Sequence, residues 1–364
     1  MKNLINSRAL LAGLMITTCF YACKKDMGST NNLKISQANL AAKVSSIEVT
    51  QTNLVSDTAG FDAARIDSNL SNAWGMVAVP NGGPIWISAN HKGVSVVYND
   101  MGQTLRPPVT IPAAVAGQMG APSGVIFNST SDFGGNKFIF ATEDGIIAAW
   151  KPGDYSAVKV ADRSQSASVY KGIAMVTTGN DNFLCLTNFR HATVDVFDKD
   201  FNFVTDQRFA DPSIPAGFAP FNIRSINNKV YITYAKQKLP DKMDDQSGPG
   251  NGYVDIFNTN GTLEKRFASQ GTLNSPWGLE IASKGFAGVQ PVVLIGDFGD
   301  GRINVFSMQG NFKGQLQKNG TPLSIDGLWA IGFLKNNASP TDPLFFTAGP
   351  DDENHGLFGT LKKE

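Results

Sequence analysis

The stretch from residue 277 to residue 306 decides the fold. It opens with Trp-Gly-Leu-Glu-Ile at 277–281, continues with Val-Val-Leu-Ile at 292–295, and closes with Gly-Arg-Ile-Asn-Val-Phe at 301–306. Short apolar runs of this kind, separated by turn-forming residues, are typical of β-strands. No long segment carries the apolar stripe of an amphipathic helix. The sequence therefore predicts an all-β protein.

This three-strand pattern recurs six times along the chain. Equivalent positions in the first strand of each copy are Gly75, Gly124, Gly172, Asn222, Gly278 and Ala330. Their spacings are 49, 48, 50, 56 and 52 residues. Three clear strands and a weaker fourth at such a period are the pattern of a propeller blade. The alternative, two sandwich domains, does not explain so even a repeat.

The sixth copy has no room for a fourth strand before Glu364, and a segment ahead of the first copy can supply it. Residues 47–54 (Ile-Glu-Val-Thr-Gln-Thr-Asn-Leu) are β-prone and are expected to pair with residues 356–361. This pairing would close the ring and remove its exposed strand edges. We predict a single six-bladed β-propeller over residues 47–364, closed by its N-terminal strand.

The N-terminal segment has the features of a secretion signal. Lys2 and Arg8 precede a short apolar stretch from Ala9 to Ala22, and Cys23 directly follows the small residue Ala22. This arrangement resembles the lipobox of bacterial lipoproteins, whose cysteine is acylated and becomes the mature N-terminus. We expect residues 1–22 to be a lipoprotein signal peptide, Cys23 the lipidation site and residues 23–46 a tether. An ordinary signal peptide cleaved nearby is the alternative.

Charge and cysteine content narrow the function classes. Lys+Arg and Asp+Glu both number 31, so no net positive field would attract nucleic acid. Cys185 lies in an apolar run and is expected to be buried packing. The sequence contains no P-loop, Gly-x-Ser-x-Gly elbow, His-Glu-x-x-His or Cys-x-x-Cys motif. Nucleophilic catalysis by serine or cysteine is therefore unsupported.

Eight motifs carry a resemblance to a known group of propellers. They lie at residues 123–128, 219–223, 234–237, 248–252, 274–279, 296–304, 325–330 and 346–351. Together they resemble an uncharacterised bacterial propeller family that is distantly similar to the NHL-repeat propellers. The resemblance implies the propeller fold. It implies no activity, because that family has no established reaction.

Polar residues gather in the loops of one predicted face. The loop before strand 1 of each blade and the loop joining strands 2 and 3 open on one side of a propeller, and the 1–2 turns open on the other. The 2–3 loops hold all three histidines and many carboxylates, and three tryptophans stand at strand starts. This composition favours a ligand site, whereas the alternative is that the tryptophans only pack between blades. The predicted ligand-binding residues are Trp74, His91, Glu143, Asp144, Arg190, His191, Phe221, Lys236, Trp277, Asp297, Asp300, Asp326 and Trp329.

A divalent-metal site is a further expectation, and no other cofactor is expected. Asp351, Asp352 and His355 lie in the last 2–3 loop, next to His91 of the first blade in a closed ring. Carboxylate and imidazole groups can together hold a divalent cation. A solvated turn is the alternative.

The fourth 2–3 loop, residues 236–251, is longer than the others. Its length predicts a flap over the same face, with a plain surface insertion as the alternative. Glu143 or Asp144 could serve as a general base on this face.

These features favour an extracytoplasmic, lipid-anchored propeller that binds a ligand or partner on its 2–3 loop face. The expected partners are a membrane, reached through the lipid, and a small molecule, glycan or envelope protein. The expected location is the cell envelope of a bacterium, periplasmic or surface-exposed. One alternative is a hydrolase or lyase acting on a carbohydrate or lactone through carboxylates or a metal. Another is a scaffold in an envelope complex.

Overall fold

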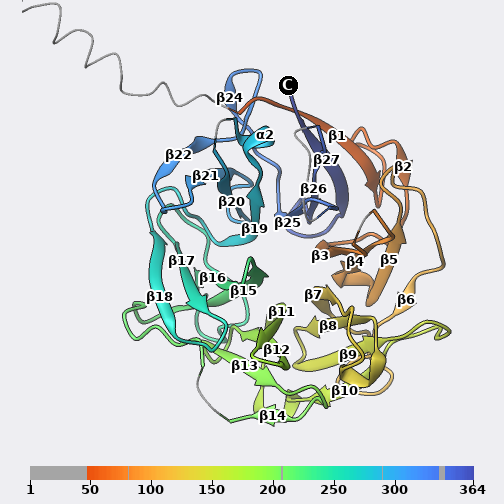
Figure 1. The fold of residues 1–364 in the computed structure, drawn as a ribbon. Helices are drawn as coiled ribbons and strands as arrows, with labels where there is room; N and C mark the ends of the chain where they lie inside the picture. Colours follow the sequence, from red (N-terminus) through yellow and green to blue (C-terminus); the bar gives the residue numbers. More distant parts are fainter. Residues whose placement is uncertain (1–46, 81, 206–207, 289, 336–340) are drawn as a thin grey trace, which may run out of the picture. The chain divides into compact units, whose positions relative to one another are not determined.

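The computed structural model describes residues 47–80, 82–205, 208–288, 290–335 and 341–364. The described residues from 47 to 364 form one compact unit, built of six sheets arranged as blades around a central axis (Figure 1); all strand pairs in the blades are antiparallel except β1 with β2. The predicted six-bladed β-propeller is confirmed. The predicted signal peptide, Cys23 and the tether fall outside the described residues.

The first three blades each contain four strands in sequential order. Blade 1 has β3 (Ala73–Ala78), β4 (Ile85–Ala89), β5 (Val94–Tyr98) and β6 (Val109–Thr110); blade 2 has β7 (Pro122–Phe127), β8 (Phe138–Thr142), β9 (Ile146–Trp150) and β10 (Val158–Asp162); blade 3 has β11 (Tyr170–Thr178), β12 (Asp181–Asn188), β13 (Thr193–Phe197) and β14 (Phe203–Val204). Short 3-10 helices lie at η1 (Asn90–Lys92), η2 (Phe133–Gly135) and η3 (Ser164–Ser166).

Blades 4 and 5 repeat this plan, and the sixth contains both ends of the propeller. Blade 4 has β15 (Phe218–Ile226), β16 (Lys229–Lys236), β17 (Gly252–Asn258) and β18 (Leu263–Ser269); blade 5 has β19 (Pro276–Ala282), β20 (Val292–Asp297), β21 (Ile303–Ser307) and β22 (Phe312–Gln315); blade 6 has β25 (Leu328–Gly332), β26 (Leu344–Ala348), β27 (Leu357–Lys363), β1 (Val49–Ser56) and β2 (Arg65–Ile66). A hairpin of β23 (Gln317–Lys318) and β24 (Thr321–Pro322) and the short helix α2 (Lys284–Ala287) complete the structure. In the described residues, no helix has both the length and the apolar character needed to span a bilayer.

The ring closes through the N-terminal strand, as the sequence predicts. β1 runs antiparallel to β27, with register from Val49 opposite Lys363 to Ser56 opposite Leu357. Val49 and Val55 are fully buried, so the strand contributes side chains to the core as well as hydrogen bonds to the sheet. β27 therefore has a partner on both sides.

Shortening the buried side chain of the closing strand tests its contribution to stability. Val49→Ala is expected to lower the free energy of unfolding by about 2 kcal/mol, because it removes two methyl groups from a filled core. Thr52→Ala on the exposed side of the same strand is the matched control and should change it by less than about 0.5 kcal/mol. Equal values for the two variants in urea titrations would show that β1 is not packed as described.

The inner strands approach one another closely at the six equivalent positions found in the sequence. A Cβ atom on Gly75 would lie 2.4 Å from the carbonyl oxygen of Ser123, and one on Gly172 would lie 2.8 Å from the Cα atom of Asn222. In every blade the register between strands 1 and 2 shifts at this point. Such bulges increase the local bend of a strand. The glycine at this position in four of the blades thus lets the bent inner strands approach closely around the axis.

Packing between blades fills the remainder of the ring. Trp86 of blade 1 stacks on Phe138 of blade 2 with ring centroids 3.9 Å apart. Cys185 is buried in the apolar layer between blades 3 and 4, as expected from its sequence context.

Candidate functional site

The central channel has two chemically different ends. Ala73 at the start of β3 pairs with Ala89 at the end of β4, so each inner strand begins beside the 2–3 loop of its blade and ends at the 1–2 turn. The strand starts and 2–3 loops therefore share one end of the channel, which we call the loop end. The opposite end is called the turn end.

Aromatic side chains plug the loop end of the channel. Trp329 stacks on Trp74 with centroids 3.8 Å apart and on Phe298 with centroids 3.9 Å apart, and Trp277 packs against its edge at 5.9 Å. Phe221 belongs to the same cluster. Trp74 and Trp329 are each 1 % exposed. The tryptophans, offered above as ligand platforms, here pack between blades, so a ligand would reach them only after a rearrangement.

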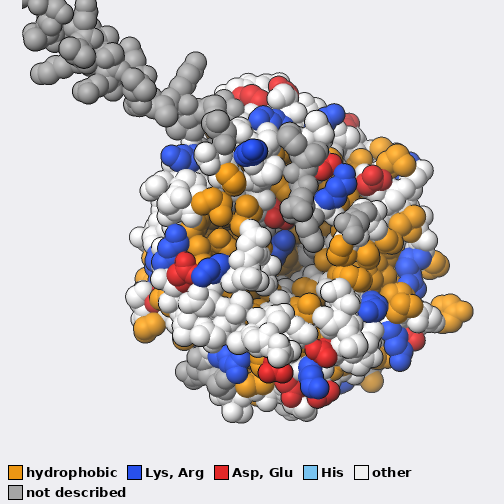
Figure 2. Space-filling view, viewed as in Figure 1, with side chains coloured by type: hydrophobic (Ala, Val, Ile, Leu, Met, Phe, Trp, Pro, Cys, Tyr) orange, Lys and Arg blue, Asp and Glu red, His pale blue; other side chains and the backbone are white. Residues whose placement is uncertain are grey.

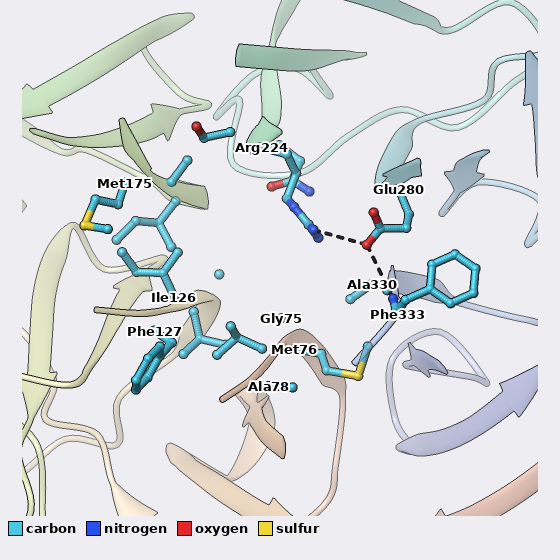
Figure 3. A pocket seen from close by; sticks show the side chains of 18 of the residues that line it. Gly75, Met76, Ala78, Ile126, Phe127, Met175, Arg224, Glu280, Ala330 and Phe333 are labelled. Atoms are coloured by element: carbon cyan, nitrogen blue, oxygen red, sulfur yellow. Dashed lines mark hydrogen bonds and ion pairs between the residues drawn. The ribbon is translucent and has the colours of Figure 1, made fainter. Parts of the chain in front are cut away.

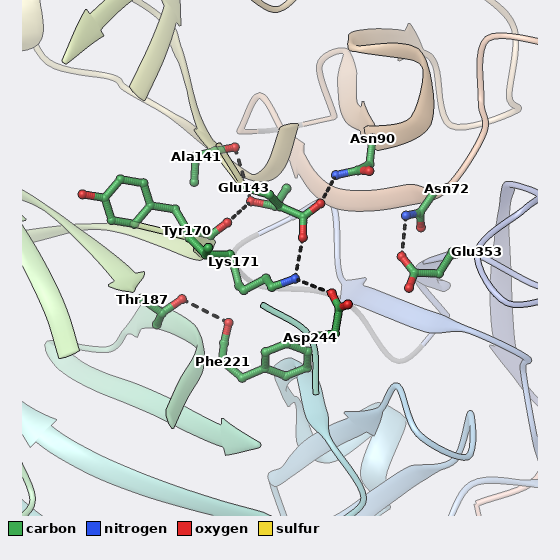
Figure 4. Close-up of polar contacts among 12 residues, drawn as sticks. Asn72, Asn90, Ala141, Glu143, Tyr170, Lys171, Thr187, Phe221, Asp244 and Glu353 are labelled. Carbon is green, nitrogen blue, oxygen red and sulfur yellow. Dashed lines mark hydrogen bonds and ion pairs between the residues drawn. The ribbon is translucent and has the colours of Figure 1, made fainter. Parts of the chain in front are cut away.

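A buried lysine lies against this plug and organises the polar groups at the loop end. Lys171, the first inward residue of blade 3, is 2 % exposed, and its Nζ atom lies 4.9 Å from the ring centre of Trp74. It donates to Glu143 Oε1 at 2.5 Å and forms an ion pair with Asp244 at 3.6 Å (Figure 4). Glu143 Oε2 also accepts from the Asn90 amide at 2.8 Å. Ionic partners and the aromatic ring together offset the cost of burying the ammonium group.

Another carboxylate, that of Glu353, lies near Lys171 and its two acidic partners, on the 2–3 loop of blade 6. Glu353 accepts a hydrogen bond from Asn72 at 2.6 Å, and Asn72 in turn accepts from the indole N–H of Trp329 at 2.9 Å. Burial, followed by repulsion from the charge of Glu143, raises the pKa of Glu353 to about 7. The carboxyl of Glu353 is therefore poised to exchange a proton near neutral pH.

The raised pKa of Glu353 makes a specific prediction about stability. An ordinary glutamate has a pKa of 4.5, and the folded protein raises that of Glu353 to about 7. Between these values the folded state holds a proton that the unfolded chain has released, so the free energy of unfolding falls as pH rises through this window. Glu353→Gln should remove this loss and stabilise the protein by about 2 kcal/mol at pH 8 and by little at pH 4. Urea titrations at the two pH values measure the difference.

Asp352→Asn on the same turn is the control, because Asp352 is exposed. It should show no comparable change between pH 4 and pH 8. A Glu353→Gln effect of the same size at both pH values would contradict the raised pKa.

The long fourth 2–3 loop covers this cluster. Its base is held by Gln237, whose side chain donates to the carbonyl of Phe189 at 2.6 Å, and by the Gln246 amide, which donates to the Lys236 carbonyl at 2.7 Å. Between these anchors, the carboxylate of Asp244 reaches Lys171 while its side chain remains 65 % exposed. The loop is thus fixed at its base and touches the buried site through one partly solvated ion pair.

The remaining predicted ligand residues surround this centre without joining it. His91 lies 3.5 Å from the Asn72 amide, and His191 contacts the Ser166 carbonyl at 2.7 Å. Asp144 accepts hydrogen bonds from Thr142 and from the Ala114 amide, the carbonyl of Arg190 accepts one from Gln237, and Lys236 ends β16. Asp297 is fully buried and accepts from Asn304 at 2.6 Å, Asp300 lies 4.0 Å from Arg302, and exposed Asp326 accepts from the Asp351 amide at 2.8 Å. Burial, followed by the charge of Asp300, raises the pKa of Asp297 well above its ordinary value. Only Glu143 of the predicted set bonds directly to Lys171.

The predicted metal ligands lie at the outer side of the last loop. His355 contacts Asp57 at 3.2 Å through Nδ1 and Asp351 at 3.8 Å through Nε2, and Asp352 is exposed. Within the described ranges, no three His, Cys, Asp or Glu side chains converge as a metal site would require. The structure therefore does not assemble the predicted set.

Sequence reasoning missed four members of the cluster: Lys171, Asn72, Asp244 and Glu353. Lys171 stands at the strand-start position occupied by Trp or Phe in four of the other five blades, the exception being Ser123 of blade 2. A lysine at a position where most of the other blades have an aromatic residue was the signal that the sequence offered.

Fold and site define the chain as a six-bladed β-propeller whose channel is plugged by aromatic residues at the loop end. No family model matches it. The chain is 31 % identical over 320 residues to the uncharacterized protein L690 of Acanthamoeba polyphaga mimivirus, covering 83 % of each. It therefore belongs to the family of that protein. The uncharacterized protein R648 of the same virus is 29 % identical over 320 residues, covering 83 % of this chain and 77 % of R648.

Several solved structures share the architecture at low sequence identity. The α-L-arabinofuranosidase of Fusarium graminearum matches with a TM-score of 0.56 and 8 % identity, covering 86 % of this chain and 98 % of the enzyme. Regucalcin of Agrobacterium tumefaciens, a calcium-binding protein, matches at 0.52 and 14 %, covering 87 % and 96 %. A streptogramin B lyase matches at 0.51 and 13 %, covering 87 % and 97 %. These likenesses establish the fold alone.

Proposed function

We propose that the protein binds a small polar ligand at the loop end of its channel, with Lys171, Glu143 and Glu353 as the contacting groups. The observation that carries the proposal is Lys171, an almost fully buried ammonium group ringed by carboxylates under a loop. A propeller needs no such group to close its ring, since the other blades place apolar or neutral side chains at this position. The composition of the cluster suits a hydroxyl-rich or glycan ligand.

Access to this site requires the loop at 236–251 to move. Asp244 forms the outermost ion pair of the cluster, and at 3.6 Å with an exposed carboxylate it contributes little to stability. A ligand group that accepts hydrogen bonds can take its place beside Lys171. Asp244 then acts as an internal substitute for the ligand, and the ion pair that the ligand would replace is a weak one.

A thermal-shift screen of monosaccharides, uronic acids, amino sugars and short peptides tests the proposal. A true ligand at 100 times its dissociation constant should stabilise the wild-type protein by about 2.7 kcal/mol. Glu143→Gln and Glu353→Gln should abolish this stabilisation, whereas Asp241→Ala, on the exposed part of the same loop, should retain it. A ligand that stabilises all four proteins equally binds elsewhere and would refute the assignment.

Acid–base catalysis is the second candidate, favoured by the pKa of Glu353. A carboxyl that titrates near pH 7 can donate a proton, and the ionised Glu143 nearby can accept one. A hydrolase or lyase acting on a carbohydrate or lactone would use such a pair. If Glu353→Gln bound a substrate normally and no longer turned it over, catalysis would replace simple binding; turnover unaffected by this change would exclude the role.

We also propose that the propeller is lipid-anchored in a bacterial cell envelope and related to the bacterial family that its motifs resemble. The support is the sequence around Cys23 and the motifs quoted above. Cys23→Ser should shift the protein from the membrane fraction to the soluble fraction. Continued membrane attachment of that variant would contradict the lipid anchor.

A further inference from the structure

The turn end of the channel contains a cavity that the sequence did not indicate. It has a volume of about 350 Å³ and is lined by residues from the inner strands of all six blades, on the side of the ring away from Lys171. Figure 2 shows the ring hollowed near its centre, and Figure 3 shows the lining side chains. The 1–2 turns around it have ordinary turn sequences. Residues of the inner strands and of the segments directly after them, such as Phe333, line this end.

The walls of the cavity are apolar and adaptable. Met76 of blade 1 and Met175 of blade 3 line it, and Phe127 and Phe333 add aromatic surface. All four side chains are only partly buried, so they retain apolar surface to offer a ligand. Methionine side chains adjust to the shape of what they contact. Such walls suit a compact apolar body, because its burial removes apolar surface from water on both sides.

One ion pair, between Arg224 and Glu280, lies among the residues that line the cavity. Arg224 of blade 4 donates to Glu280 Oε2 of blade 5 at 3.3 Å (Figure 3). The backbone amides of Ile281 and Phe333 also donate to the Glu280 carboxylate, at 2.8 Å and 3.4 Å. Glu280 is therefore held by several donors, and its side chain is 13 % exposed.

Arg224 is less constrained than its partner. Its side chain is 34 % exposed, and within the described residues its guanidinium group makes this single hydrogen bond. A guanidinium group has five N–H donors in a planar fork that matches an anionic oxygen pair. Four donors thus remain for a ligand, while the oxygens of Glu280 are already engaged. This asymmetry favours an anionic ligand over a cationic one.

We propose that the turn-end cavity is a second binding site, for a small apolar organic anion. The anionic group pairs with Arg224, and the apolar body lies between the methionine and phenylalanine side chains. This site shares no residue with the Lys171 cluster. A test of this site therefore does not depend on the function proposed for the loop end.

Two fluorescent probes that differ by one charged group test the proposal. 8-Anilinonaphthalene-1-sulfonate is an apolar anion, and N-phenyl-1-naphthylamine has the same rings without the sulfonate. Arg224→Gln should weaken binding of the anionic probe about tenfold or more and change binding of the neutral probe by less than about twofold. Asp352→Asn, an exposed residue outside the cavity, should leave both affinities unchanged.

A cavity-filling variant locates the binding. A Cβ atom on Gly332 would meet Glu280 Oε2 at 3.6 Å and Met76 Cε at 3.7 Å, which is ordinary contact distance. Gly332→Leu should therefore fold and weaken both probes about tenfold or more by filling the cavity. If it does not fold, Ala78→Leu fills the same cavity from β3.

Three results would overturn the proposal. The first is an anionic probe that does not bind the wild-type protein. The second is binding that survives both Arg224→Gln and the filling variant, which would place the probe elsewhere on the surface. The third is an equal loss of both probes in Arg224→Gln, which would show that the site does not recognise the anionic group.

Discussion

Replacing Lys171 with methionine is expected to lower the free energy of unfolding by about 3 kcal/mol, because the change leaves a largely buried carboxylate without its counter-ion. Among the residues that the structure describes, the Glu143 carboxylate would keep only the Asn90 amide as a hydrogen-bond partner. Urea titration measures the loss. Lys159→Met breaks an exposed pair with Asp162 whose side chains are 38 % and 35 % exposed, and it should cost less than about 1 kcal/mol.

The double variant Lys171→Met, Glu143→Gln separates the ion pair from simple packing. Neutralising Glu143 removes the uncompensated charge, so the double variant should be more stable than Lys171→Met alone. A double variant that is less stable than the single one would mean that Glu143 does not depend on Lys171.

A methyl group at Gly75 should have a comparable or larger effect. The added Cβ would lie 2.4 Å from the Ser123 carbonyl oxygen and 2.9 Å from the Gly124 Cα atom, and both are backbone atoms of the neighbouring blade. Two inner strands would have to move apart, so Gly75→Ala should cost about 4 kcal/mol or prevent folding.

Gly332→Ala provides the comparison on another inner strand. Its added Cβ would make only ordinary contacts with flexible side-chain ends, and the variant should keep wild-type stability within about 1 kcal/mol. Similar thermal denaturation for Gly75→Ala and Gly332→Ala would contradict the close approach of the inner strands at Gly75.

The blade count and the ring closure were predictable because they depend on local patterns. The Trp-Gly-Leu run at 277–279 repeats at a fixed spacing, and residues 47–54 are a strand-like segment beside a blade that lacks one. The spacing of the repeat and the strand propensity of each segment can both be recognised along the sequence, without knowing which distant residues meet in the fold.

The two ends of the channel were not predictable in the same way, because their residues meet only when the ring forms. Glu143 and Lys171 come from different blades, and Glu353 lies at the far end of the chain. Arg224 and Glu280 likewise come from adjacent blades. The tryptophans show a related limit of the sequence, because an aromatic residue at a strand start has the same sequence signature whether it faces a ligand or a neighbouring ring.

The pairing of β1 with β27 has a consequence for the order of events during synthesis. Val49 leaves the ribosome before any complete blade, and its partner Lys363 follows the strands of the other five blades. Five blades can pair their strands within themselves as they emerge, whereas the sixth waits for β27. The long separation adds only modestly to the entropy of closure, but it delays closure until the strands of all six blades have been made. A chain that stops before β27 is therefore an open ring with an unpaired strand, which distinguishes it from a molecule whose ring is closed.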